Sequence, residues 1–150
     1  QGVLDSAPVV TGLDIRISYP IFGPAAEKIS FLSHYVHQAP AEDNEANNFL
    51  VAETEAKGSL PDLFHPDGFS AAQLIVQALA ENEADDVDGM IGALEGFTYA
   101  GVKGEQTVRA EDHAHLQPMF HVSLKAEGDS FEPEVLRTLA PDEVAPPVVE

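Results

Sequence analysis

The order in which strand-like and helical patterns follow one another constrains the fold of this chain most. Two segments with strand-like patterns, residues 9–22 and 29–36, precede three helical segments, and a β-rich stretch follows them. Strands and helices that intermingle along a chain are typical of α/β folds. Two such strands before three helices cannot form a complete doubly wound sheet, so we expect partner strands to lie upstream, outside this sequence.

The two strand-like segments differ in pattern. From Leu13 to Tyr19 apolar and polar residues alternate, which predicts an extended segment that a cluster of proline and glycine at 20–24 closes. Residues 29–36 place apolar side chains on both faces, as in a strand that is covered on both sides, and Pro40 ends the segment.

Three helices are predicted from caps and apolar spacing. Asp43 and Asn44 can cap the first, which runs toward Lys57 and stops at Gly58. The second has Asp67 or Ser70 as a cap, and its apolar residues follow one helical face: Ala71, Leu74, Ile75, Ala78 and Leu79. The third begins at Asp85 or Asp86, ends at Gly96 and places these residues on one side: Val87, Met90, Ile91 and Leu94.

The remainder of the chain carries β patterns. Residues 97–99 lead into a turn at Gly101 and Gly104, and residues 106–109 follow it. A polar loop at 110–117 precedes the strand pattern of residues 118–125. After a turn at Gly128, the acidic and proline-rich end predicts an extended tail over residues 127–150.

The charge balance excludes several partners. The chain has 7 Lys and Arg against 26 Asp and Glu, for a net charge of −19, and a surface this negative repels nucleic acid and anionic lipid. We expect no insertion of this segment into a membrane, because no apolar run approaches the length of a membrane span. The residues from Gln1 onward lack the pattern of an export signal.

Catalytic and metal-binding motifs give little support for an enzyme. The sequence has no cysteine, no G-x-S-x-G, no P-loop, no G-x-G-x-x-G and no H-E-x-x-H, so we expect no enzyme and no cofactor. His113 and His115 beside Glu111 and Asp112 leave open a small metal-binding protein as an alternative, because imidazole and carboxylate groups bind Zn²⁺.

Four short motifs, in this order, resemble one family. They are F-H-P-D-G-F-S-A-A-Q at 64–73, M-I-G-A-L-E-G at 90–96, G-V-K-G at 101–104, and R-A-E-D-H at 109–113 with Q-P-M-F at 117–120. A weaker match covers residues 9–40. The chain resembles the C-terminal portion of the branched-chain amino-acid-binding (type I periplasmic) solute-binding proteins of ABC transporters.

The resemblance implies an α/β fold that is part of a two-lobed, three-layer sandwich, incomplete here. Residues 1–27 would end the second lobe, residues 28–126 would form the crossover and the C-terminal part of the first lobe with late β strands, and the tail would follow. Such a protein binds an amino acid or similar small carboxylate between its lobes and docks on an ABC permease. It acts in the periplasm or outside the cell, and its export signal is not in this chain. The same fold also serves ligand-sensing receptors, which remains a second alternative.

The resemblance also indicates ligand-binding residues. It places Gly12, Leu13 and Asp14 at the cleft edge of the second lobe, where the Asp14 carboxylate would bind the ligand's ammonium group. Phe64, His65 and Phe69 would form a wall of the cleft. Ser33, His34 and Tyr35 are hinge candidates. The alternative for Asp14 is a solvent-facing side chain on an alternating strand, and for the aromatic residues a loop that packs on the core.

Overall fold

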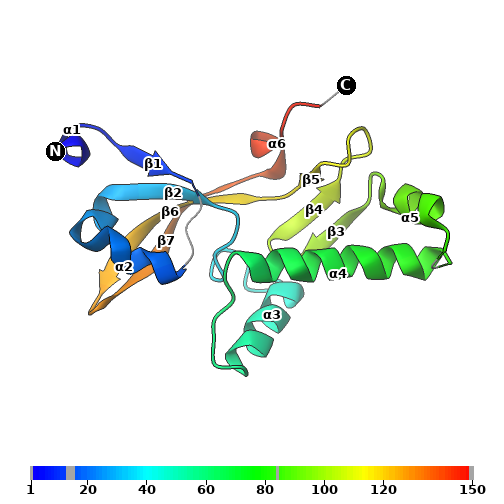
Figure 1. Ribbon diagram of the computed structural model, residues 1–150, viewed down its shortest axis with the longest axis horizontal. Helices are drawn as coiled ribbons and strands as arrows, with labels where there is room; N and C mark the ends of the chain where they lie inside the picture. Colours follow the sequence, from blue (N-terminus) through cyan, green and yellow to red (C-terminus); the bar gives the residue numbers. More distant parts are fainter. Residues whose placement is uncertain (1, 13–15, 84, 149–150) are drawn as a thin grey trace.

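The computed structural model describes residues 2–12, 16–83 and 85–148, which fold into two halves joined side by side (Figure 1). The four-stranded half holds the sheet β1-β2-β6-β7 with the short helices η1, α2 and η2. The helical half holds the sheet β3-β4-β5 with α3, α4 and α5. The mixture of sheets and helices confirms the predicted α/β class.

The four-stranded half is built around one mixed sheet. Strand β1 (Val9–Thr11) is parallel to β2 (Ile29–Ser33), β2 is antiparallel to β6 (Met119–Glu127), and β6 is antiparallel to β7 (Ser130–Leu139). Helix α1 (Val3–Ser6) precedes β1. The core of this half consists of seven buried side chains: Tyr19, Ala26, Phe31, Val36, Phe120, Val122 and Leu124.

The predicted extended segment 9–22 is wrong from Arg16 onward. Residues Arg16–Ser18 form the 3₁₀ helix η1, Tyr19–Phe22 form α2, and Gly23–Lys28 form the 3₁₀ helix η2. Pro20 lies in the first turn of α2, where its fixed φ favours a helix. The turn also buries Tyr19, whose ring centroid lies 5.9 Å from that of Phe31. Leu13, Asp14 and Ile15 lie outside the described residues.

The predicted tail over residues 127–150 is also wrong in most of its length. Residues 130–139 form β7, the edge strand of the sheet, and Pro141–Val144 form the short helix α6. Phe131 and Val135 pack against the core cluster, so this acidic segment has its own apolar face. Pro133 is tolerated because an edge strand leaves one side of its backbone unpaired.

The helical half contains the three predicted helices. Helix α3 (Glu45–Glu55) begins after Asn44, whose Oδ1 accepts a hydrogen bond from the amide of Asn47, and α5 (Val87–Leu94) begins after Asp86 in the same way. Helix α4 (Phe64–Glu81) begins earlier than the caps predicted at Asp67 or Ser70. Its N-cap, Leu63, makes no side-chain cap bond, but the carboxylate of the preceding Asp62 accepts from the Leu63 amide.

A three-stranded antiparallel sheet completes the helical half. Strands β3 (Thr98–Gly101) and β4 (Gly104–Val108) form a hairpin, and β5 (His115–Leu116) pairs with β4. Gly104 has a φ of 119°, a conformation that favours glycine. Tyr35, Leu50 and Val102 form the small buried cluster of this half, and Ala46 and Phe69 pack against it.

The chain crosses between the halves after Ser33 and again before Met119. Strands β1 and β2 pair with each other across positions 27 and 28, where the lobe boundary stays a prediction. After β7 the chain crosses a third time, and the guanidinium of Arg109 donates to the carbonyl of Pro146 over 2.8 Å.

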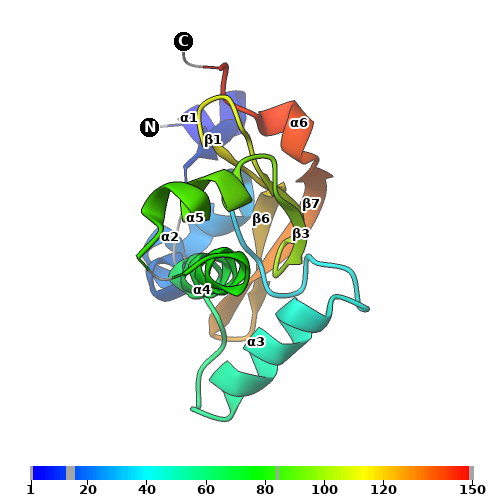
Figure 2. The ribbon, with the colours of Figure 1, turned by 90° about the vertical axis from the view of Figure 1, so that its right-hand side faces the viewer.

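Helices α4 and α5 leave a broad apolar face uncovered among the described residues. Figure 2 shows α5 running across α4, which is seen end-on, on the side away from α3. The groove between the two helices is lined by aliphatic side chains and Met90, and Ile75 is 56% exposed and Val87 is 61% exposed. Within the described residues, no helix is both long and apolar enough to cross a membrane.

Candidate functional site

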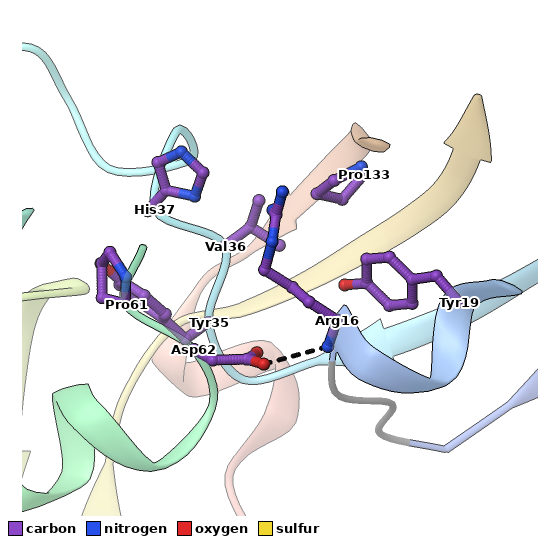
Figure 3. A pocket seen from close by; sticks show the side chains of 8 residues that line it. All are labelled: Arg16, Tyr19, Tyr35, Val36, His37, Pro61, Asp62 and Pro133. Carbon is purple, nitrogen blue, oxygen red and sulfur yellow. Dashed lines mark hydrogen bonds between the residues drawn. The ribbon is translucent and has the colours of Figure 1, made fainter. Parts of the chain in front are cut away.

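The two halves meet at a cluster of polar and aromatic side chains from four separate segments (Figure 3). Arg16 and Tyr19 come from η1 and α2, residues 35–37 from the connection after β2, residues 61–62 from the loop before α4, and Pro133 from β7. These residues line a cavity of about 10 Å³, which is room for one water molecule. We call this cluster the junction.

Arg16 connects three of these segments. Its Nη2 lies 2.7 Å from Oε2 of Glu132 on β7, and its main-chain N–H donates to Oδ2 of Asp62 over 3.0 Å. The Asp62 carboxylate also accepts from the amide of Leu63, and the Asp62 amide donates to Nδ1 of His65. The start of α4 is thereby tied to η1 in the other half.

A second polar network lies on the helical side of the junction. Asp67, in the first turn of α4, faces Nζ of Lys103 at 2.8 Å and Nε2 of His34 at 3.1 Å. Lys103 also donates to the side-chain oxygen of Gln117, and its side chain is fully buried. His34 Nε2 further contacts the carbonyl of Leu63 at 2.7 Å. The network joins the connection after β2, helix α4 and the β3–β4 hairpin.

Burial controls the protonation of the junction. Desolvation lowers the pKa of His37, and the nearby Arg16 lowers it further, while Glu132 and other carboxylates oppose the shift. Burial also raises the pKa of the Tyr35 hydroxyl and lowers the pKa of the Lys103 ammonium group. Asp67 opposes the Lys103 shift through a hydrogen bond and its charge. His37 is therefore biased toward its neutral form.

The structure describes four of the six predicted ligand-binding residues, and these four lie in different environments. Gly12 is exposed after β1, and Leu13 and Asp14 lie outside the described residues. His65 is exposed and contacts Asp62 at the junction, whereas Phe64 is exposed by 74%. Phe69 packs against the cluster of the helical half, with its ring centroid 6.0 Å from that of Phe49. Phe69 thus matches the alternative of a core contact.

The hinge candidates lie where the chain leaves the four-stranded sheet. The Ser33 hydroxyl donates to the carbonyl of Tyr35, and the Tyr35 hydroxyl donates to Asn47 of α3 over 2.8 Å. Sequence reasoning missed Arg16, His37 and Asp62, although all three line the junction. Arg16 falls at a polar position of an alternating pattern, so nothing in that pattern distinguished it from a surface residue.

The histidines considered for metal binding have separate partners. His113 Nε2 lies 2.9 Å from Oε1 of Glu95, whereas His115 Nε2 lies 3.0 Å from the hydroxyl of Tyr99. Asp112 instead holds Arg109, with Nε–Oδ1 and Nη2–Oδ2 distances of 2.7 and 2.6 Å. In residues 2–12, 16–83 and 85–148, no three His, Asp or Glu side chains gather as metal ligands would.

Comparison with known proteins gives a consistent family. The chain matches the sequence profile of a periplasmic binding protein family over residues 2–129. No curated protein matches it significantly. Among solved structures, it is similar to an ABC-type branched-chain amino acid transporter from Rhodopseudomonas palustris, with 28% identity and a TM-score of 0.79. That similarity covers 93% of this chain and 38% of the other.

Two further solved structures share the fold. One is an amino acid ABC transporter substrate-binding protein from Pseudomonas fluorescens, with 24% identity and a TM-score of 0.73 over 93% of this chain and 38% of the other. The other is a solute-binding protein from Rhodopseudomonas palustris in complex with p-hydroxybenzoic acid, with 18% identity and a TM-score of 0.71. That match covers 84% of this chain and 34% of the other. The chain thus spans well under half the length of these proteins.

Proposed function

The chain belongs to the periplasmic binding protein family, and from this premise we propose that it is part of the solute-binding component of an ABC uptake transporter. The match over residues 2–129 carries the proposal, and the similarity to a branched-chain amino acid transporter structure supports it. The ligand would be an amino acid or a similar small carboxylate. It would bind between two lobes, of which the four-stranded half and the helical half are parts.

The arrangement of the halves is suited to binding by closure. Two compact units joined by a few chain crossings can change their relative orientation with little change inside either unit. A ligand that contacts both units favours the closed arrangement by its difference in affinity for the two states. The junction brings side chains of both halves together, and a ligand would need the halves to open there, because the cavity of about 10 Å³ holds one water molecule.

An amino-acid ligand needs both a charged partner and apolar contacts in its site. An amino acid needs an acidic partner for its ammonium group, and Asp14, two residues before Arg16, stays our candidate. Gly12 and Leu13 would supply backbone and apolar contacts beside it, and Phe64, His65 and Phe69 of α4 would form a wall of the cleft. A p-hydroxybenzoate-like ligand, such as the one in a structure that shares this fold, has a carboxylate but no ammonium group.

We further propose that the protein is not an enzyme, that it acts outside the cytoplasmic membrane and that it delivers its ligand to an ABC permease. The family supports these proposals, since its members that resemble this chain are named as transporter and solute-binding proteins.

Calorimetric titration tests the ligand class in the protein that the complete gene encodes. We expect leucine to bind and Asp14→Ala to weaken its affinity at least about tenfold, because a desolvated ammonium group would lose its charged partner. Asp129→Ala, which removes a carboxylate from the β6–β7 turn, is the matched control and should leave the affinity unchanged. If p-hydroxybenzoate binds and leucine does not, the amino-acid ligand is wrong. If neither these two compounds nor any other amino acid binds, the proposed function fails.

A further inference from the structure

We propose that Asp62 is a positioning residue that fixes the orientation of the two halves relative to each other. Its carboxylate spans the junction: Oδ2 accepts from the Arg16 amide in the four-stranded half, and Oδ1 accepts from the Leu63 amide at the start of α4. The residues Arg16 and Asp62 are 46 positions apart in sequence. Figure 3 shows the contact crossing the gap between η1 and the loop before α4.

Both ends of this contact are held in place by further bonds. On the four-stranded side, the Arg16 guanidinium pairs with Glu132 of β7 at 2.7 Å, and the Arg16 side chain is only 24% exposed. On the helical side, the Asp62 amide donates to His65, and the next carbonyl, that of Leu63, contacts Nε2 of His34. Each end of the Arg16–Asp62 bond is thus fixed within its own half. We therefore expect that loss of this bond permits the halves to rotate relative to each other.

Loss of the Asp62 carboxylate would release the main-chain N–H of Arg16. A carboxylate is a strong acceptor for a main-chain N–H, and an alanine leaves that N–H without this partner. This positioning role goes beyond the proposed function, and it can be tested without any ligand by measuring the distance between the halves.

Distance measurement between spin labels on the two halves tests the proposal in the full chain. The sequence has no cysteine, so Thr98→Cys on β3 and Glu134→Cys on β7 create two labelling sites without background, and both positions are exposed. We expect one narrow distance distribution in the doubly labelled protein that keeps Asp62, and a broadened or shifted distribution in its Asp62→Ala variant. Asp62→Asn keeps one oxygen acceptor and should remain closer to the parent than Asp62→Ala.

The matched control is Asp86→Ala, which removes the carboxylate that caps α5 within the same half but away from the junction. It should leave the distance distribution unchanged. Distributions that are identical in the parent and Asp62→Ala would overturn the proposal, as would equal broadening by Asp62→Ala and Asp62→Asn.

Amide exchange gives a second measurement in case Asp62→Ala perturbs folding. The Arg16 amide should exchange at least about tenfold faster in Asp62→Ala, while the amides of β6 keep their protection, since only the junction loses an acceptor. Unchanged exchange at Arg16 would contradict the proposal whatever the label distances show. Loss of protection throughout β6 would identify Asp62 as a residue of general stability and would also overturn its positioning role.

Discussion

Lys103 is a buried charged residue of the helical half. Its ammonium group is fully buried, and Asp67 and Gln117 are the side chains that face it. Desolvation lowers the pKa of Lys103 although Asp67 lies 2.8 Å away. The Lys103–Asp67 pair therefore stabilises the hairpin less than its short distance suggests, because the free energy of desolvating the ammonium group offsets much of the attraction.

Truncating Lys103 should cost more than replacing it with an apolar residue of similar length. Lys103→Ala leaves a cavity and unpaired groups on Asp67 and Gln117, so we expect a loss of about 2–3 kcal/mol in the free energy of unfolding. Lys103→Met fills the space and removes the buried charge, and should cost about 1 kcal/mol or less. Urea unfolding of both variants measures the difference. A loss for Lys103→Met as large as that for Lys103→Ala would contradict this expectation, because both variants remove the charge and only Lys103→Met fills the space.

His37 makes the stability of the protein depend on pH. Burial, followed by the charge of Arg16, lowers the pKa of His37 in the folded protein, so the unfolded chain takes up a proton first as the pH falls. The contribution of neutral His37 is complete above its ordinary pKa of about 6.5 and is lost as the pH falls through the lowered pKa. As the pH falls from about 7.5 to about 5, the free energy of unfolding should therefore decrease less in His37→Gln than in the parent protein. Equal losses in thermal unfolding would contradict the assignment.

Among the elements, α3 shows best how local sequence and long-range packing combine. Its N-cap residue Asn44 accepts from the Asn47 amide through Oδ1 and donates through Nδ2 to the carbonyl of Gly101 at the end of β3. One side chain thus starts a helix and ties it to a sheet. The cap of α5, Asp86, accepts from the Gly89 amide of its own helix, and within the described part of the chain its side chain makes no hydrogen bond to a sheet.

This difference predicts the cost of removing each cap. Asp86→Ala should lower the free energy of unfolding by about 1 kcal/mol, the usual value for an N-cap. Asn44→Ala should cost about 1.5–2 kcal/mol, because the bond to Gly101 is lost as well. Chemical denaturation of the two variants compares them directly. Equal costs would show that the Asn44–Gly101 bond contributes nothing to stability.

Local patterns predicted some elements and missed others for identifiable reasons. The starts of α3 and α5 followed from Asn44 and Asp86, because a cap is a property of neighbouring residues. The start of α4 at Phe64 has no side-chain cap and depends on long-range contacts such as that of His34 with Leu63. The sequence pattern did not reveal strand β7, because this segment is a strand through its pairing with β6 and not through its composition.

The candidate site was harder to predict than the elements. Arg16, His37 and Asp62 meet only because three distant segments converge at the junction, and no local pattern records that convergence. The family resemblance pointed to the same region through His65, but also to Phe69, whose ring belongs to a packed cluster. A motif identifies a segment more reliably than it identifies the direction of each side chain.

For the whole molecule, the uncovered face of α4 and α5 is the main physical feature. Helices bury an apolar face against another layer, and an exposed groove of this kind usually marks a missing contact. The groove between these helices measures about 300 Å³ and is lined almost entirely by apolar atoms of residues such as Leu74, Met90 and Leu94. We propose that strands of the same lobe, outside this sequence, cover the groove. The solved structures compared above support this proposal, because the chain covers only 38% or less of each of them.

The coding sequence upstream of the Gln1 codon tests this claim most directly. We predict a reading frame that continues upstream and encodes an export signal followed by further strand and helix patterns of two lobes. A start codon immediately before Gln1, together with a 150-residue product that unfolds cooperatively as a monomer, would contradict it.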